Sequence, residues 1–356
     1  MIRVLLIAVL GLFSSCSEHN NSTQAVEQPA SAPLAPPKDN FTVGVVIPSV
    51  PLRMDAGQTF ALYLPKGYTD SGKLPAIIFF DPHGDGTVPL NLYHDLADQY
   101  HFILIGSNSS RNGIPLDQTQ AIAYNLFGEA KSRFAVDPAK ITLCGFSGGA
   151  KVALLSGASN PAIANIIYAG AKVDITPNHP ISVLGFAGLR DMNYTDLVLF
   201  EQSLNNVQGI NHYLIEWKGK HEFPTADVFK DAFIFLNTST VENYNKKQAT
   251  ITKEQLKLEQ DKKNEYLHAF QDKNLDWWKK EIAILNAKKK NDIMNERLLG
   301  FLSLACYSIG GGQLVQDKLD VAEKILAVYK LADPDNKDCD SMLTVLSQKK
   351  AAGPLH

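Results

Sequence analysis

The chain has 356 residues and a formal net charge of −3 at pH 7, with 34 Lys and Arg against 37 Asp and Glu. Charges of both signs are mixed, without the basic patch that a nucleic-acid partner requires. The four cysteines and nine histidines show no spacing typical of a metal site. We therefore expect a protein that binds no nucleic acid and needs neither a metal nor another cofactor.

The first residues are typical of an export signal. Arg3 precedes an apolar segment at 4–13 that is too short to span a bilayer, and two serines then lead to Cys16. This pattern resembles the signal of bacterial lipoproteins. The resemblance implies a signal at 1–16, a lipid on Cys16 and anchoring in the bacterial cell envelope, at the periplasmic or surface face of the outer membrane. The alternative is an ordinary cleaved secretory signal.

Residues 17–40 are polar and then rich in Ala and Pro. They show no periodic apolar face, so we expect a disordered tether between the membrane and the rest of the chain. No later stretch is expected to cross a membrane. About 316 residues follow the tether, which is enough for one large domain and a smaller one. We place these domains at 41–240 and 245–350.

Short apolar segments alternate with segments of helical periodicity in the first of these domains. We expect strands at 41–47, 58–64, 74–80, 101–106, 141–144, 163–169, 181–186 and 211–217. We expect helices at 90–100, 116–134, 150–157, 195–207 and 225–236. This alternation predicts an α/β fold with a mostly parallel, doubly wound sheet. Ligands of such sheets bind at the carboxyl ends of the strands, so polar residues there are candidates for a site.

A Gly-x-Ser-x-Gly turn at 145–149 joins the strand at 141–144 to the helix that follows it. In such a turn the serine adopts a strained backbone conformation, and the glycines let strand and helix approach closely. The serine hydroxyl is then exposed above the sheet, which makes Ser147 a candidate nucleophile. The alternative is a glycine-rich turn without chemistry.

Two further strand ends carry the partners that a serine nucleophile needs. Asp191 follows the strand at 181–186, and His221 follows the last strand of the sheet. A neutral imidazole can take the proton of Ser147, and a carboxylate can fix the tautomer of that imidazole. The order Ser, Asp, His is the one expected with this type of turn. Asp174 is the rival acid.

The negative oxygen of a tetrahedral intermediate needs two preorganised N–H donors. We expect these donors to be the backbone N–H groups of Gly148 and Asp85, the latter in the loop after the third predicted strand. Gly84 and Phe146 could line the pocket. His83 could line it too, or cap its own turn.

The motifs GFSGG, DPHGDG, GLRD and GKHEFP, together with DPAK before the turn, make residues 41–237 resemble the α/β-hydrolase superfamily. Within it, the chain is similar to feruloyl esterases, polyhydroxybutyrate depolymerases and prolyl-oligopeptidase-like hydrolases. The resemblance implies a serine hydrolase that acts on esters or amides. DPHGDG departs from the plain HGGG loop of related enzymes. Only about 11 residues separate the strands at 163–169 and 181–186, which predicts a site without an inserted lid.

The composition changes after residue 244, where Lys, Glu, Gln, Asn and Leu dominate. Amphipathic helices are expected within 253–290 and at 296–309, 315–332 and 341–348, with a break at the three glycines 310–312. Part of this region resembles a tetratricopeptide repeat, and a generic helical hairpin domain is an equal interpretation. The lysines at 288–290 are interpreted as a solvated face. The helices could bind a partner protein, pack against the first domain or shape its cleft.

The leading hypothesis is a membrane-tethered carboxylesterase that forms an acyl-enzyme on Ser147. The alternatives are a non-catalytic binding or scaffold lipoprotein with the same fold, and a prolyl-oligopeptidase-like peptidase. Cys144 is expected to be a buried, inert residue below the turn. The sequence leaves open whether Cys306 and Cys339 pair.

Overall fold

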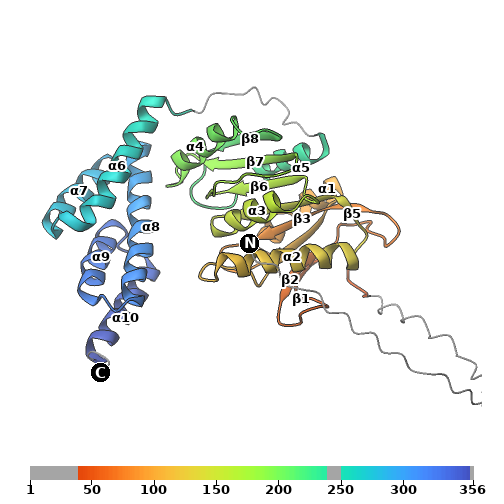
Figure 1. The fold of residues 1–356 in the computed structure, drawn as a ribbon, viewed down its shortest axis with the longest axis horizontal. Helices are drawn as coiled ribbons and strands as arrows, with labels where there is room; N and C mark the ends of the chain where they lie inside the picture. The colour runs from red at the N-terminus through yellow and green to blue at the C-terminus, as the bar shows by residue number, and fades with distance from the viewer. Residues whose placement is uncertain (1–38, 239–249, 353–356) are drawn as a thin grey trace, which may run out of the picture. The chain divides into compact units, whose positions relative to one another are not determined.

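A computed structural model describes residues 39–238 and 250–352 (Figure 1). The predicted export signal, Cys16 and nearly all of the predicted tether lie outside the described residues. The boundary that we expect between the two domains falls within 239–249, which also lies outside them. The described residues from Phe41 onward form one compact unit.

The centre of this unit is an eight-stranded sheet with the strand order β1-β2-β4-β3-β5-β6-β7-β8. Its strands are β1 Val46–Pro51, β2 Thr59–Tyr63, β3 Leu74–Phe80, β4 Ile103–Ser107, β5 Val136–Phe146, β6 Asn165–Ala169, β7 Ile181–Gly188 and β8 Ile210–Trp217. Strand β2 runs antiparallel to both β1 and β4, and all other neighbours are parallel. The predicted α/β class with a mostly parallel sheet is confirmed.

Helices cover both faces of the sheet. They are α1 Thr87–Tyr100, α2 Leu116–Arg133, α3 Gly148–Ser159, α4 Tyr194–Leu204 and α5 Ala226–Thr238. Strand β3 shows why its sequence is continuously apolar. Ile78 and Phe80 pack in a cluster with α2, α3 and α4, whereas Ile77 and Phe79 pack in a second cluster with α1 and α5. Successive side chains of a strand point to opposite faces, so a strand covered on both faces has no polar positions.

The first strand differs from its prediction, because it lies at Val46–Pro51 rather than at 41–47. Gly44 has a φ of +74°, and its N–H donates to the carbonyl of Leu64 at 2.8 Å. This turn ends the extended segment that the sequence predicted. Val43 and Val45 are 43% and 46% exposed. Both valines therefore belong to an exposed turn before β1 and not to a buried strand.

Five helices follow: α6 Lys253–Asp272, α7 Leu275–Lys288, α8 Ile293–Val315, α9 Leu319–Ala332 and α10 Lys337–Ala352. Side-chain caps explain where three of them begin. Thr252 and Gln255 form a reciprocal capping box at α6, Asn274 caps α7, and Asp292 caps α8. The helices share a core that includes Trp278, besides residues of α8, α9 and α10. A tetratricopeptide-like role for these helices stays a prediction.

The expected break at Gly310–Gly312 is wrong, because α8 continues through the three glycines. A Cβ atom on Gly310 would lie 3.2 Å from Leu326 Cδ2, and one on Gly311 would lie 3.0 Å from Met342 Cε. The glycines thus let side chains of α9 and α10 approach the backbone of α8. This packing offsets the low helix propensity of glycine. That low propensity was the reason for predicting a break. The chain instead turns at Asp317, where φ is +55°.

Helix α8 is long and apolar enough to cross a membrane by length and composition, which the sequence reading did not anticipate. Helices in the core of a folded domain meet the same criterion. In α8, Leu298 and Leu302 are buried in the core of the helical part. Arg297 on the same helix is buried and bonded to Glu259 of α6. We therefore describe α8 as a packing helix.

Candidate active site

Ser147 sits in the turn between β5 and α3, with a φ of +52° and a ψ of −120°. Among the described residues other than glycine, only His101, Ser147 and Asp317 have a positive φ. Such a conformation costs about 1–3 kcal/mol and persists only where the surroundings hold it. Here the Ser147 N–H donates to the carbonyl of Ala169 at the end of β6, at 2.8 Å. The strained serine that the sequence pattern predicts is therefore present.

Two glycines of this turn are required by close backbone contacts. A Cβ atom on Gly145 would lie 2.1 Å from the carbonyl oxygen of Gly149. A Cβ atom on Gly149 would lie 2.0 Å from the carbonyl oxygen of Phe80 in β3. Both distances are far below van der Waals contact and involve backbone that has no room to move. Any larger residue would push α3 away from the sheet and displace Ser147.

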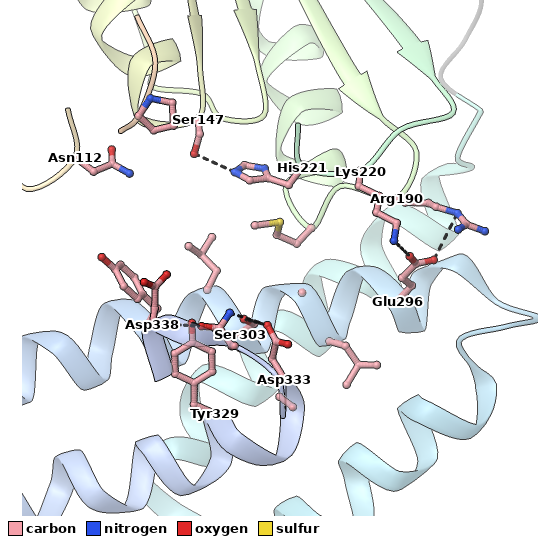
Figure 2. A pocket seen from close by; sticks show the side chains of 18 of the residues that line it. Asn112, Ser147, Arg190, Lys220, His221, Glu296, Ser303, Tyr329, Asp333 and Asp338 are labelled. Carbon is pink, nitrogen blue, oxygen red and sulfur yellow. Dashed lines mark hydrogen bonds and ion pairs between the residues drawn. The ribbon is translucent and has the colours of Figure 1, made fainter. Parts of the chain in front are cut away.

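The structure brings Ser147, His221 and Asp191 into one line of hydrogen bonds. His221 Nε2 lies 3.0 Å from Ser147 Oγ (Figure 2). The Nδ1 atom of the same ring lies 3.0 and 3.1 Å from the two carboxylate oxygens of Asp191. Asp191 is 1% exposed, so water does not compete for its oxygens. This geometry requires the tautomer with the proton on Nδ1, because a carboxylate only accepts.

The loops that carry the acid and the base are tied together by their backbones. The N–H of Leu189 donates to the carbonyl of Trp217 at 2.8 Å, and the N–H of Arg190 donates to the carbonyl of Gly219 at 2.9 Å. The N–H of Asn193 donates to Asp191 Oδ1 at 2.8 Å. The carboxylate thus has a fixed orientation. This orientation follows from the parallel pairing of β7 with β8, which brings the ends of both strands side by side.

Asp174, the rival acid, lies elsewhere. Its side chain is 84% exposed, and its Oδ1 pairs with Lys172 Nζ at 2.9 Å. Both residues lie in the segment between β6 and β7. Of these two aspartates, Asp191 is the one that is hydrogen-bonded to His221.

The loop after β3 corrects the prediction for Asp85. Its N–H points to Asp81 Oδ1 at 3.4 Å, and its own carboxylate accepts from the N–H of Thr87 at 3.0 Å. Asp85 is not among the residues that line the cavity in front of Ser147. These bonds assign the N–H of Asp85 to the folding of its own loop and not to the predicted oxyanion hole. The short side chains of Asp81 and Asp85 compete for backbone donors, which the glycines at 84 and 86 do not reveal.

Of the three residues predicted to line the pocket, two do so in the structure. His83 and Phe146 line the cavity, and Gly84 does not. Gly84 has a φ of +75° and serves the turn of its loop. Phe146 packs beside the imidazole of His221, with 4.8 Å between the two ring centres. Gly148 begins α3, where the first N–H groups of a helix have no acceptor within the helix.

Asn112 is a residue of the site that the sequence analysis missed. It lies in the loop between β4 and α2, and its N–H donates to the carbonyl of Pro82 at 2.8 Å. Its Oδ1 lies so close to Gly148 that a Cβ atom on that glycine would be 1.8 Å away. Figure 2 shows the Asn112 amide facing the space in front of Ser147. The available signal was its position, because it follows a strand whose carboxyl end lies at the same edge as Ser147.

A cavity of about 1110 Å³ lies in front of Ser147 and His221. One wall comes from the loops of the sheet. The opposite wall comes from α8 and α9 and the start of α10, as Figure 2 shows. On this wall lie Leu299, Gly300, Ser303, Leu304, Tyr307, Tyr329, Ala332, Asp333, Asn336 and Asp338. The segment between β6 and β7 contains no helix, as expected, but the helices after residue 250 do cover the site.

Charges of both signs line this cavity. Glu296 of α8 lies between two cations, 3.5 Å from Arg190 Nε and 3.8 Å from Lys220 Nζ. These cations directly precede Asp191 and His221 in the chain. The remaining charged residues of the lining, apart from the histidines, are Arg111, Lys289, Lys290, Asp333 and Asp338. Lys289 and Lys290 are exposed, as the sequence suggested, and they also border this cavity.

The helical wall is also held by side-chain hydrogen bonds. Ser303 donates to Asp333 Oδ2 at 3.0 Å, and Tyr329 donates to Asn336 Oδ1 at 3.0 Å. Burial raises the pKa of the Tyr329 hydroxyl to about 12, so it stays protonated and remains a donor. Within residues 39–238 and 250–352 no cluster of three or more His, Cys, Asp or Glu has the arrangement of a metal site.

The strand order, the serine turn after β5, the acid after β7 and the histidine after β8 define the α/β-hydrolase fold. The resemblance that the sequence suggested is therefore confirmed at the level of the fold. The sequence matches no protein-family profile and no curated protein.

Solved structures with a similar fold include two esterases and a peptidase. The hyperthermophilic esterase from the archaeon Pyrobaculum calidifontis is 11% identical, with a TM-score of 0.45 over 56% of this chain and 87% of that chain. Thermogutta terrifontis esterase 2, solved phosphonylated by sarin, is 13% identical, with a TM-score of 0.40 over 51% and 90%. Porphyromonas gingivalis dipeptidyl peptidase 4 is 12% identical, with a TM-score of 0.44 over 54% and 35%. At these values the similarity carries no conclusion about the site or its substrate.

Proposed function

We propose that this protein is a serine hydrolase, and specifically a carboxylesterase that forms an acyl-enzyme on Ser147. The observation that carries the proposal is the unbroken line of hydrogen bonds from Ser147 through His221 to the buried carboxylate of Asp191. A serine without such partners is a weak nucleophile, and burying a carboxylate for no purpose is costly.

In the proposed first step, Ser147 Oγ attacks the ester carbonyl carbon while His221 Nε2 takes the hydroxyl proton. The C=O π electrons move to the oxygen and form a tetrahedral intermediate. Its collapse breaks the C–O bond to the leaving alkoxide, which takes the proton from His221. A water molecule then attacks the acyl-enzyme with His221 again as base, which releases the carboxylic acid and restores Ser147. Asp191 holds the imidazole and stabilises its cationic form.

The developing oxyanion needs two donors. The N–H of Gly148 at the start of α3 is the first, because it belongs to the residue after the nucleophile. We assign the second donor to Nδ2 of Asn112, whose side-chain amide lies beside Gly148 with Oδ1 nearest to it and faces the same cavity as Ser147. An amide donor in this place would make up for the N–H of Asp85, which the oxyanion loop uses itself.

The lining of the cavity supports esters with a short acyl group and a polar alcohol. Charged and hydrogen-bonding side chains from both walls surround Ser147. A long alkyl chain bound there would remove water from these groups without replacing their hydrogen bonds, which is unfavourable. Phe146 offers an apolar surface next to the imidazole that is large enough for a small acyl group. A lipid-anchored position at the membrane, through Cys16, remains part of the proposal.

A fluorophosphonate probe tests the proposed activity, because it labels only an activated serine. We expect labelling of the wild-type protein and none of Ser147→Ala. A panel of p-nitrophenyl esters from acetate to palmitate, together with aminoacyl anilides, then separates the reaction classes. Faster turnover of acetate and butyrate supports the esterase, and preferred turnover of anilides supports the peptidase. A folded wild-type protein that is neither labelled nor active would leave the binding or scaffold role.

A further inference from the structure

Two buried cations from the C-terminal helices bind the backbone on both sides of Asp191. Lys263 of α6 donates from Nζ to the carbonyl of Met192 at 2.8 Å. Arg297 of α8 donates from Nη1 to the carbonyl of Leu189 at 2.8 Å. These carbonyls belong to the residue after Asp191 and to the residue two before it. The loop that carries the acid is therefore held from outside the sheet.

Both cations are fixed by further partners. Lys263 is 3% exposed, and its Nζ also contacts Thr195 Oγ1 at 2.8 Å and Asp196 Oδ2 at 3.0 Å. Arg297 is 4% exposed and binds the carboxylate of Glu259, with 2.6 Å between Nη2 and Oε2. Glu259 itself is fully buried. Buried charges tolerate little displacement, because leaving one without its partner is expensive.

A cation–π contact and close backbone packing add to the same interface. The guanidinium of Arg297 lies 4.8 Å from the centre of the Tyr194 ring, at the start of α4. A Cβ atom on Gly300 of α8 would lie 3.2 Å from Met192 Cβ, so the helix backbone packs directly on the residue after Asp191. The interface therefore combines hydrogen bonds, charge pairs and close packing along the segment from Leu189 to Asp196.

The acid loop is thus clamped between two supports. Its N–H groups at Leu189 and Arg190 bind the loop that carries His221. Its carbonyls at Leu189 and Met192 bind the helices. Without the second support, the loop would be free to turn about the first, and the carboxylate would lose its two-oxygen contact with His221 Nδ1.

We propose that Lys263 and Arg297 are positioning residues of the hydrolase, and that the C-terminal helices complete the active site by fixing the Asp191 carboxylate against His221. The helical part is then an integral piece of the catalytic machinery and not a separate module. This proposal rests on the proposed hydrolase function, because it concerns the same three residues.

The test substitutes Lys263 by Met in the full chain, which keeps the length of the side chain and removes the donor and the charge. Lys262→Met is the matched control. Lys262 is the neighbouring lysine of α6, and it binds Glu265 and Glu281 of the helical part instead of the acid loop. Steady-state kinetics with p-nitrophenyl acetate are normalised to active sites by the burst of p-nitrophenol.

For Lys263→Met we expect kcat per active site to fall about 10–100-fold with KM nearly unchanged, since misplacing a catalytic group by about 1 Å can cost 10²-fold. The acid limb of the pH–rate profile should also move to lower pH, because a displaced carboxylate stabilises the imidazolium less. A purely structural role would reduce the number of active sites and the melting temperature, and it would leave the profile of the remaining sites unchanged.

Arg297→Lys serves as the second variant if Lys263→Met does not fold, because it keeps a charge beside Glu259 and shortens the reach to the carbonyl of Leu189. It should also lower kcat and move the acid limb of the pH–rate profile to lower pH, and both changes should be smaller than in Lys263→Met. The proposal is overturned if a folded variant at either position keeps the wild-type kcat per active site and pH profile. A wild-type protein that no fluorophosphonate labels would instead refute the proposed function.

Discussion

Substituting Asp191 by Asn tests the assignment of the acid most directly. Both carboxylate oxygens lie within 3.1 Å of His221 Nδ1, and Oδ1 also accepts the N–H of Asn193. In the variant, the NH₂ group would take one of these places and oppose the Nδ1 proton. The imidazole can avoid this only by moving its proton to Nε2, and it then has no lone pair to accept the proton of Ser147.

The structure also sets the size of this effect. Asp191 is 1% exposed, so no water replaces the lost acceptor. For a serine triad with intact geometry and the wrong tautomer, kcat falls about 10⁴-fold, which corresponds to about 5 kcal/mol of transition-state stabilisation. Because Asn and Asp have the same shape, we expect the variant to fold and its KM for p-nitrophenyl acetate to change little.

Asp174→Asn is the matched control, since it makes the same change at the rival acid, whose side chain is 84% exposed. Stopped-flow measurement of the p-nitrophenol burst separates acylation from deacylation in each variant. An Asp191→Asn protein that keeps more than about a tenth of the wild-type kcat would refute the reasoning, as would an Asp174→Asn protein with the larger loss of kcat.

Adding Lys263→Met to Asp191→Asn should lower kcat little further, because both changes act through one carboxylate.

Four other outcomes are expected. Asn112→Ala should lower kcat about 10²-fold with little change in KM, and an unchanged kcat would remove Asn112 from the proposed oxyanion hole. Tyr329 has a pKa raised by burial from 10.0 to about 12, so it stabilises the fold fully below pH 10 and loses this contribution as the pH rises toward 12. In urea titrations at pH 9 and pH 11.5, Tyr329→Phe should therefore lose less stability than the wild type; an equal loss would contradict this account. Cys306 and Cys339 are free and buried, and burial raises the pKa of both thiols. They should react with Ellman's reagent within seconds after unfolding without a reductant and only slowly in the native protein, whereas a disulfide would leave them unreactive in both. Finally, Cys16→Ser should move the expressed protein from the membrane fraction to the soluble one, and membrane retention would count against the predicted anchor.

The sequence alone determined most of the fold, because the signals for it are local. An uninterrupted apolar run such as β3 is stable only as a strand covered on both faces. The strained turn at Ser147 was predictable because its glycines lie within two residues of it and form a recognisable local pattern, although one of their close contacts is with Phe80 of β3. The beginnings of α6, α7 and α8 coincide with capping side chains for the same reason.

Tertiary structure decided what depends on residues far apart in the chain. Asp174 and Asp191 each follow a strand, and only the pairing of β7 with β8 places Asp191 against His221. The loss of Asp85 as a donor and the approach of Asn112 to Gly148 arise from contacts between loops that no local pattern encodes.

The largest such difference concerns the C-terminal helices. Their amphipathic pattern predicted helices, and it could not reveal that α8 and α9 wall the cavity in front of Ser147. Nor could it reveal that Lys263 and Arg297 are buried and donate to the carbonyls on both sides of Asp191. Hydrophobic periodicity shows which face of a helix is apolar. The partner of a buried charge depends on tertiary packing, because the carbonyls that Lys263 and Arg297 bind lie 71 and 108 residues away in the sequence.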